Sequence, residues 1–337
     1  MTYTRSYENR RLTGHLEQHG SKSGMPTLGL FIFGLIFFLS GGLMILCGLK
    51  IVPLNPKNLD APHWILSAMG AAFVLASTLI WNLVKRQAAA NRRVREAKRL
   101  YPGERAFQDY SWDTRGFQPQ RWKPALSSLK GAIFLTVFLG PFNWWAYFSA
   151  QSPPMLKVIV GLFDLTLLLI IGYAVLQIGR AFKFGDSRIL FAQFPYRLGQ
   201  PVMIRWQPPS GGLFEATRGS FTLRCVKEYY ETTGSGKQRT KRLVHEQIWE
   251  SKWEFNEPRS FSGSDLVELT FEAPGDLPPA ELHSLKPVFW ELEVKIEMPG
   301  LDFSQRYLVP VYEPHSDDAN AFATGQNAAN PNPPIGG

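Results

Sequence analysis

The sequence predicts two unlike parts in one chain: a membrane domain of four transmembrane helices, followed by an all-β antiparallel sandwich. Three observations support this prediction. Four apolar runs in the first half are each long enough to cross a bilayer. A strongly basic segment divides them into two pairs. After residue 184, short runs rich in β-branched and aromatic residues alternate with Gly and Pro turns, a pattern typical of a sandwich.

The apolar runs predict the membrane spans. A hydrocarbon core of about 30 Å needs about 20 helical residues. The spans are therefore expected at about 28–52, 64–84, 131–150 and 156–178, within a membrane domain of residues 26–184. The first run is too long for a signal-peptide core, which favours a retained anchor. Residues 1–25 are polar and lack periodicity, so we expect a disordered cytoplasmic tail there.

The basic segment, residues 85–130, sets the orientation. It has 12 Lys and Arg residues against 4 acidic ones, and cationic loops beside membrane helices stay in the cytoplasm. With an even number of spans, both termini and the sandwich are expected on the cytoplasmic side of a bacterial inner membrane.

The segment itself should continue the second helix to about residue 100 and turn at Tyr101-Pro102-Gly103-Glu104. It should then lie on the inner leaflet through Trp112, Phe117 and Trp122. Contact with anionic lipid explains the net charge of +8, so membrane lipid is an expected partner and nucleic acid is not.

The predicted sandwich covers residues 185–312. Its seven expected strands are 187–191, 201–207, 220–230, 242–255, 266–272, 289–298 and 305–312. In the sixth, alternation places Trp290 and Leu292 on the core face and Glu291, Glu293 and Glu297 toward solvent. Cys225 alternates with apolar neighbours, so we expect a reduced core cysteine. The tail 313–337 is rich in Asn, Ala and Pro and is predicted to be disordered.

Several motifs accompany this order of features: Tyr101-Pro102-Gly103-Glu104, Phe184-Gly185-Asp186-Ser187, Leu223-Arg224-Cys225, Trp290-Glu291-Leu292-Glu293-Val294 and Pro299-Gly300-Leu301-Asp302-Phe303. Together they resemble a family of uncharacterised proteobacterial four-span inner-membrane proteins. The closing motif resembles the strand ends of arrestin-like or immunoglobulin-like sandwiches. That family usually has Trp after the Pro-Gly-Glu, where this chain has Arg105. No catalytic or binding residue carries over.

Catalytic and cofactor motifs are incomplete. His15 and His19 lie four apart but lack the Glu of a metalloprotease helix. The stretch 233–237 resembles a fragment of a phosphate-binding loop, yet Glu231 and Gln238 occupy positions where the motif needs Gly and Ser or Thr. We therefore expect no enzyme activity, no metal and no cofactor.

Two weak binding candidates remain. Asp164 falls near the middle of the fourth span, where an acid usually faces a partner or cavity. It could be an ion or proton site, or it could hold helices together through Ser77, Thr78 or Ser40. The second candidate is a basic hairpin tip with Lys237, Arg239, Lys241 and Arg242, which could reach lipid or an acidic partner.

The function favoured by these patterns is an inner-membrane protein that presents its sandwich as a protein-interaction or scaffold module. An edge strand could accept a partner peptide by strand addition, and a homo-oligomer is equally compatible. The alternative is a transport or sensing protein that uses Asp164. The short link between the fourth span and the first strand also predicts that the sandwich is held against residues 105–123, because so few residues cannot form a flexible tether.

Overall fold

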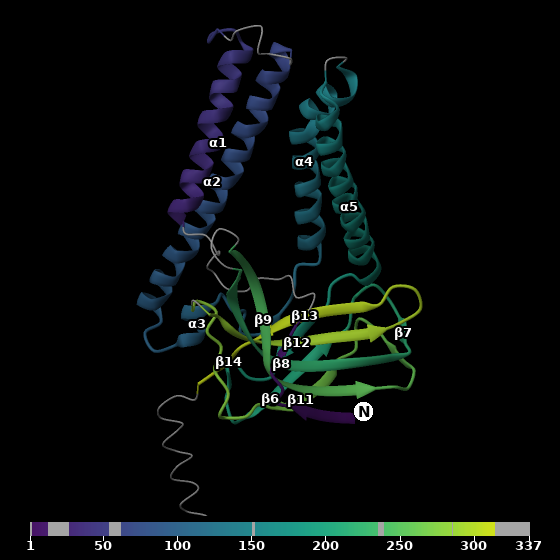
Figure 1. Ribbon diagram of the computed structural model, residues 1–337. Helices are drawn as coiled ribbons and strands as arrows, with labels where there is room; N and C mark the ends of the chain where they lie inside the picture. Colours follow the sequence, from purple (N-terminus) through teal and green to yellow (C-terminus); the bar gives the residue numbers. More distant parts are fainter. Residues whose placement is uncertain are drawn as a thin grey trace, which may run out of the picture.

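The computed structural model describes residues 2–12, 27–53, 62–149, 152–234, 239–284 and 286–313. Within these residues, 4 helices are long and apolar enough to cross a membrane. They are α1 (Thr27–Gly48), α2 (His63–Leu100), α4 (Trp122–Phe148) and α5 (Pro154–Phe184). Figure 1 shows them as two antiparallel pairs that stand on one side of a β-domain. Each expected span coincides with one of these helices, although α1 ends at Gly48, before the expected limit of residue 52, and residue 150 of the third span lies outside the described residues.

Two of these helices extend well beyond the apolar runs. α2 continues to Leu100, as predicted, and ends before Gly103, whose φ of 96° favours glycine. α4 begins at Trp122, inside the segment expected to be a loop. The apolar run marks only the part of a helix that is apolar enough to cross a membrane, so it underestimates the length of the helix itself.

Close glycine contacts join α1 to α2. Gly34, Gly41 and Gly48 recur every seven residues, so they share one face of α1. A Cβ atom at Gly41 would lie 2.7 Å from the carbonyl oxygen of Gly70, and one at Gly48 would lie 2.6 Å from the carbonyl oxygen of His63. Small residues thus let the two backbones touch, as membrane helix pairs commonly do. Gly42, next in sequence, has open space around its Cβ position.

The β-domain contains two main sheets. The six-stranded sheet has the order β1-β9-β8-β12-β13, with β2 also paired to β9, and the four-stranded sheet has the order β11-β6-β4-β3. The strands of the first are β1 (Thr2–Ser6), β2 (Arg10–Arg11), β8 (Arg218–Thr233), β9 (Thr240–Phe255), β12 (Val288–Glu297) and β13 (Phe303–Val309). Those of the second are β3 (Gly116–Phe117), β4 (Arg188–Phe191), β6 (Pro201–Gln207) and β11 (Val267–Glu272).

Two short pairs complete the domain. β7 (Phe214–Ala216) pairs antiparallel with β10 (Arg259–Phe261), and β5 (Tyr196–Arg197) pairs parallel with β14 (Val311–Tyr312). The predicted antiparallel arrangement is therefore correct for all of the described strand pairs except β5–β14. All seven expected strands are present, the last of them divided into β13 and β14.

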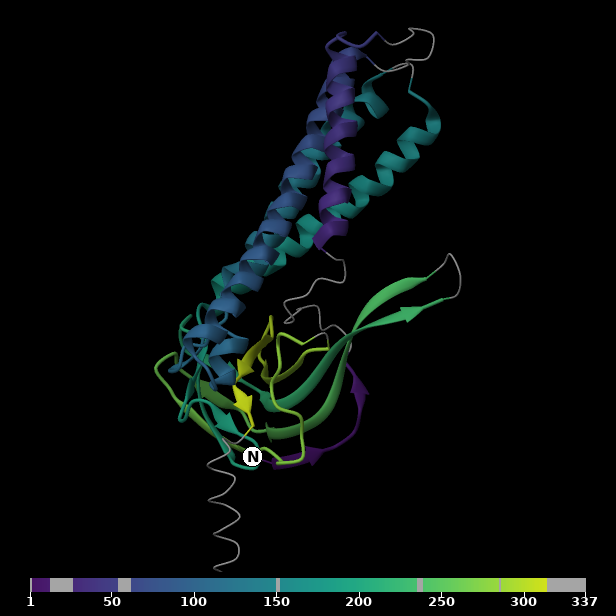
Figure 2. The same ribbon diagram turned by 90° about the vertical axis from the view of Figure 1, so that its left-hand side faces the viewer.

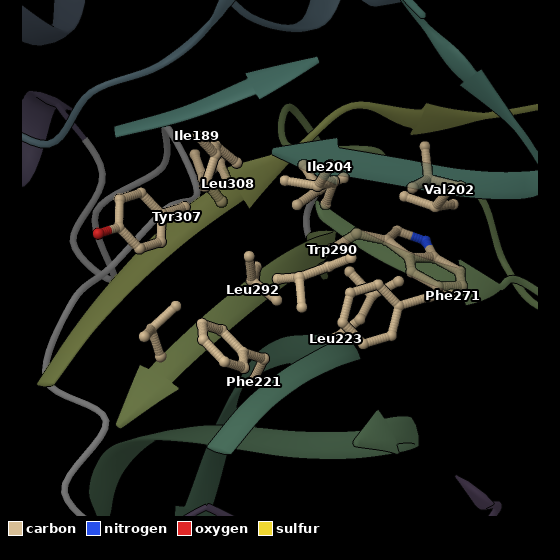
Figure 3. Packing of buried hydrophobic residues seen from close by; sticks show 14 of the residues in the cluster. Ile189, Val202, Ile204, Phe221, Leu223, Phe271, Trp290, Leu292, Tyr307 and Leu308 are labelled. Atoms are coloured by element: carbon tan, nitrogen blue, oxygen red, sulfur yellow. The ribbon is translucent and has the colours of Figure 1, made fainter. Parts of the chain in front are cut away.

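The core of the β-domain lies between the two main sheets. Trp290 and Leu292 of β12 and Leu223 of β8 face Val202 and Ile204 of β6, as Figure 3 shows. Cys225 is fully buried beside them, as predicted, and burial raises the pKa of its thiol. Large aromatic side chains dominate this core, and each contributes on the order of 2–3 kcal/mol by burial.

Three predictions about the β-domain are wrong. Residues 2–6 and 10–11 were expected in a disordered tail, but they are β1 and β2 and pair with β9; residues 13–26 lie outside the described residues. Trp112 and Phe117 were expected on the inner leaflet, but Trp112 is buried against the sandwich core and Phe117 pairs with β4. The domain therefore includes segments from before and between the helix pairs.

The third wrong prediction concerns the outer face of β12. Glu291 and Glu293 were assigned to solvent, yet both are buried, with exposures of 0% and 2%. Arg224 of β8, also buried, lies 2.6 Å from Glu293 and 3.9 Å from Glu291. On this face of β12, Lys295 and Glu297 near the strand end are exposed. Alternation identified the two faces correctly, but the outer face is covered around Glu291 and Glu293.

The carboxylate of Glu293 should make stability depend on acid. Burial alone would raise its pKa, but Arg224, Lys295 and Arg306 outweigh burial and lower the pKa to about 2 from an ordinary 4.5. A lowered pKa in the folded state adds stability above pH 4.5 that is lost as the pH falls toward 2.

We therefore expect Glu293→Gln to cost about 3 kcal/mol at pH 7 and to flatten the loss of stability between pH 4.5 and 2. Thermal unfolding of the detergent-solubilised chain across this pH range measures both effects. Glu297→Gln, on the same strand but exposed, is the control and should cost less than about 1 kcal/mol. Parallel pH curves for wild type and Glu293→Gln would contradict this assignment.

Candidate functional site

The candidate site is the junction between the helices and the β-domain. Several contacts at this junction fix the β-domain to the helices. α5 ends at Phe184, whose ring packs edge-on against Phe303 with a centroid distance of 5.3 Å. The next residue, Gly185, has a φ of 70°, and a Cβ there would lie 2.7 Å from Ser210 Oγ. Lys183 Nζ donates to the carbonyl oxygen of Leu301 at 2.8 Å. The last turn of α5 is thus built into the sandwich.

A second connection comes from the segment between α2 and α4. Its short helix α3 (Arg105–Asp109) ends in a buried carboxylate, Asp109, which accepts three hydrogen bonds. The donors are the backbone N–H of Leu282 at 2.8 Å, that of His283 at 2.9 Å and the hydroxyl of Tyr312 at 3.1 Å. Two effects raise the pKa of Tyr312: the larger is burial of its hydroxyl, and the second is the nearby charge of Asp109. Asp109 thereby ties the segment between α2 and α4 to the β11–β12 connection and to the last strand, β14.

Trp112 reinforces this connection. Its indole N–H donates to the Tyr312 hydroxyl at 3.0 Å, and its ring is 8% exposed among aromatic neighbours. Gly116 and Phe117 then pair with Leu190 and Ile189 as strand β3. The predicted contact between residues 105–123 and the sandwich is confirmed.

A hollow of about 810 Å³ lies beside this junction. We call it the basic hollow, because Arg86, Arg121, Lys123 and Lys130 line it together with a single acid, Asp186. Its other lining residues are Gln118, Pro119, Gln120, Trp122, Leu126 and Ser127. The sequence analysis placed these cations in a charged segment but did not bring them together.

One periodic signal could have revealed the hollow. Lys123, Leu126, Ser127 and Lys130 follow the spacing i, i+3, i+4 and i+7, which is one face of a helix. Recognising it required knowing that α4 begins at Trp122. Arg121, Trp122 and Asp186 form one part of the lining. The Arg121 guanidinium lies 3.5 Å from the Asp186 carboxylate and over the ring of Trp122.

The structure places Asp164 between α4 and α5. Its carboxylate accepts a hydrogen bond from the Asn143 side-chain amide at 2.9 Å and one from the Tyr147 hydroxyl at 3.4 Å. The prediction that Asp164 bonds Ser77 or Thr78 is wrong, because the hydroxyls of both residues donate to carbonyl oxygens of their own helix. The bonds that Asp164 does make connect two neighbouring helices.

The described residues of the predicted basic tip lie toward the end of a long projection, the β8–β9 arm, defined as residues 229–234 and 239–244. Arg239, Lys241 and Arg242 are exposed there, whereas Lys237 lies outside the described residues. β12 pairs with β8 only as far as Lys227, and beyond this point the two described strands of the arm pair with each other. In Figure 2 the arm rises from the sheet toward the level at which α1 begins.

The described residues contain no group of three or more His, Cys, Asp or Glu residues that could hold a metal ion. The fold and the junction together define a class of protein. It has, over the part of the chain that the structure describes, four long apolar helices and a β-domain that contacts the ends of those helices where the basic residues lie. No family model and no curated protein matches the sequence.

Among solved structures, one similar chain is the sporulation control protein Spo0M from Bacillus subtilis. It is 15% identical, with a TM-score of 0.23, and the alignment covers 42% of this chain and 54% of that one. So loose an overlap assigns neither fold nor function.

Proposed function

We propose that this chain is an integral inner-membrane protein that presents its β-domain in the cytoplasm as a protein-interaction module. One observation supports the proposal most: the β8–β9 arm projects from a domain that the Phe184, Asp109 and Trp112 contacts fix to the helices. A stiff platform with a projecting two-stranded arm offers backbone edges to an extended partner segment.

The orientation follows from charge. Arg86 and Lys130 border the predicted second and third spans on the side where the β-domain lies, and the positive-inside rule keeps that side in the cytoplasm. Alkaline phosphatase fused after Tyr312 should therefore be inactive in intact cells, while a reporter that needs the cytoplasm should be active at the same site. Strong phosphatase activity would contradict the topology.

Shortening the arm tests the interaction. Replacing residues 231–242 by Asn-Gly would close a two-residue turn on the facing pair Tyr230 and Leu243, which leaves the remaining sheet register unchanged. Photo-crosslinking in native membranes should capture the same partner bands with wild type and with an exposed-face control, Glu215→Gln. The shortened arm should lose those bands. Equal capture by the shortened arm would contradict a role for the arm.

Asp164 supports the alternative function, transport or sensing. An acid bonded to Asn143 and Tyr147 within an apolar helix pair is the arrangement of an intramembrane polar site. The two functions separate cleanly. Asp164→Asn should leave partner capture unchanged if the chain is an adaptor. If it instead abolishes a proton or ion flux measured in liposomes, transport replaces our proposal.

A further inference from the structure

The basic hollow has a composition that no contact within the described fold requires. Of its four cations, Arg121 is ion-paired with Asp186 and stacked on Trp122. Arg86, Lys123 and Lys130 are exposed side chains that converge on the hollow from α2 and α4. Three cations that face one concave space of about 810 Å³ repel one another unless an anion occupies it.

The position of the hollow selects the kind of anion. Lys130 immediately precedes the third apolar run and Arg86 follows the second, so both lie at headgroup depth. From Lys130 to Lys123 the lining face of α4 spans seven residues, or about 10 Å, toward the β-domain. The hollow therefore opens at the membrane surface and extends inward over about the depth of a phospholipid headgroup.

The remaining lining suits an amphipathic ligand better than a free anion. Leu126 lies between the two lysines on the same helix face, and Trp122 packs edge-on against Phe182 at a centroid distance of 5.0 Å. Gln118, Gln120 and Ser127 supply neutral hydrogen-bonding groups. Cations along the lining, an apolar residue between the two lysines and neutral polar groups beside them match a phosphate with an attached glycerol.

We propose that the basic hollow binds the phosphate-bearing headgroup of an anionic phospholipid from the inner leaflet. Basic pockets beside the cytoplasmic ends of membrane helices bind such headgroups. This inference rests on the membrane insertion in the proposed function, but it does not require any protein partner. The bound lipid would link α2 and α4 to the Arg121–Asp186 pair at the start of the β-domain.

Native mass spectrometry of the full-length chain in detergent tests the proposal, with phosphatidylglycerol and phosphatidylcholine as probes. Wild type should bind phosphatidylglycerol at least about tenfold more tightly than phosphatidylcholine. The variant Arg86→Gln/Lys123→Gln/Lys130→Gln should lose at least about tenfold in that affinity.

The matched control removes the same number of charges from the exposed extension of α2. Arg92→Gln/Arg95→Gln/Lys98→Gln should bind phosphatidylglycerol within about twofold of wild type. If this control weakens binding as much as the first variant, general charge attraction explains the affinity and the proposal is overturned. Should the first variant fail to elute as a folded species, Lys130→Gln alone against Lys98→Gln gives the same comparison at a single exposed charge.

A competition experiment distinguishes lipid binding from the binding of free phosphate. Inorganic phosphate and glycerol phosphate, each in large excess, should leave phosphatidylglycerol bound. Displacement of the lipid by either compound at a concentration similar to that of the lipid would show a soluble-anion site instead. Phosphatidylglycerol binding that fails while the phosphatase fusion still reports a cytoplasmic domain would overturn the lipid site alone and leave the proposed function in place.

Discussion

Asp109→Ala is expected to lower the free energy of unfolding of the β-domain by about 3–5 kcal/mol. The substitution would leave the N–H groups of Leu282 and His283 and the hydroxyl of Tyr312 without their shared acceptor. A buried donor that loses its acceptor costs about 1–3 kcal/mol. Because one carboxylate serves all three donors, no single rearranged side chain can replace it.

Thermal unfolding of the detergent-solubilised chain, followed by tryptophan fluorescence, measures this loss. The matched control is Asp113→Ala in the same segment, since Asp113 is exposed and its carboxylate accepts a hydrogen bond only from the nearby Arg115 N–H among the described side-chain contacts. The control should cost less than about 1 kcal/mol. Similar melting of both variants would show that the Asp109 contacts do not hold the junction.

Gly41→Leu is expected to separate α1 from α2. Even the first added carbon would lie 2.7 Å from the carbonyl oxygen of Gly70, which is backbone and cannot rotate away. The helices must move apart and lose contacts along their length, at a cost of about 3 kcal/mol or more. Folded yield after membrane extraction, measured by size-exclusion chromatography, should fall severalfold.

Gly42→Leu makes the same chemical change one residue away, where the Cβ position has open space. It should extract and elute like wild type. If the two variants behave alike, the close approach at Gly41 does not determine the packing of the first helix pair.

The sequence predicts the elements that have strong periodicity. The four apolar runs form helices and the seven alternating runs form strands, because long apolar runs favour helices and the sandwich core requires a continuous apolar face on each strand. β1 and β2 escaped prediction because Thr2–Ser6 and Arg10–Arg11 are polar on both faces and gain their structure only from β9. The burial of Glu293 escaped for a related reason, since its partners Arg224 and Arg306 come from two other strands.

The junction was the least predictable part. Asp109 and Trp112 have the composition of an interfacial loop, and only long-range contacts with Leu282 and Tyr312 give them a structural role. The same is true of the basic hollow, whose cations come from two helices and a connecting turn. The sequence shows the basic charges beside the apolar runs, but their convergence depends on tertiary structure.

The central claim is that the β-domain is fixed to the helices through α3. Arg105 and Glu313 form an exposed ion pair with a distance of 2.7 Å, which joins α3 to the end of the β-domain. A short bismaleimide should crosslink Arg105→Cys to Glu313→Cys in intact membranes. Cys225 should not react with the maleimide, because it is buried and the pKa of its thiol is raised. Cys47 is replaced by Ala in every variant.

The control pair is Arg105→Cys with Glu215→Cys on β7, which lies at the other end of the β-domain from α3 in Figure 1. A fixed domain predicts rapid, near-complete crosslinking of the Arg105–Glu313 pair and none of the control pair. Slow crosslinking of both pairs to a similar extent would show a domain that moves freely beneath the membrane, and would contradict the claim.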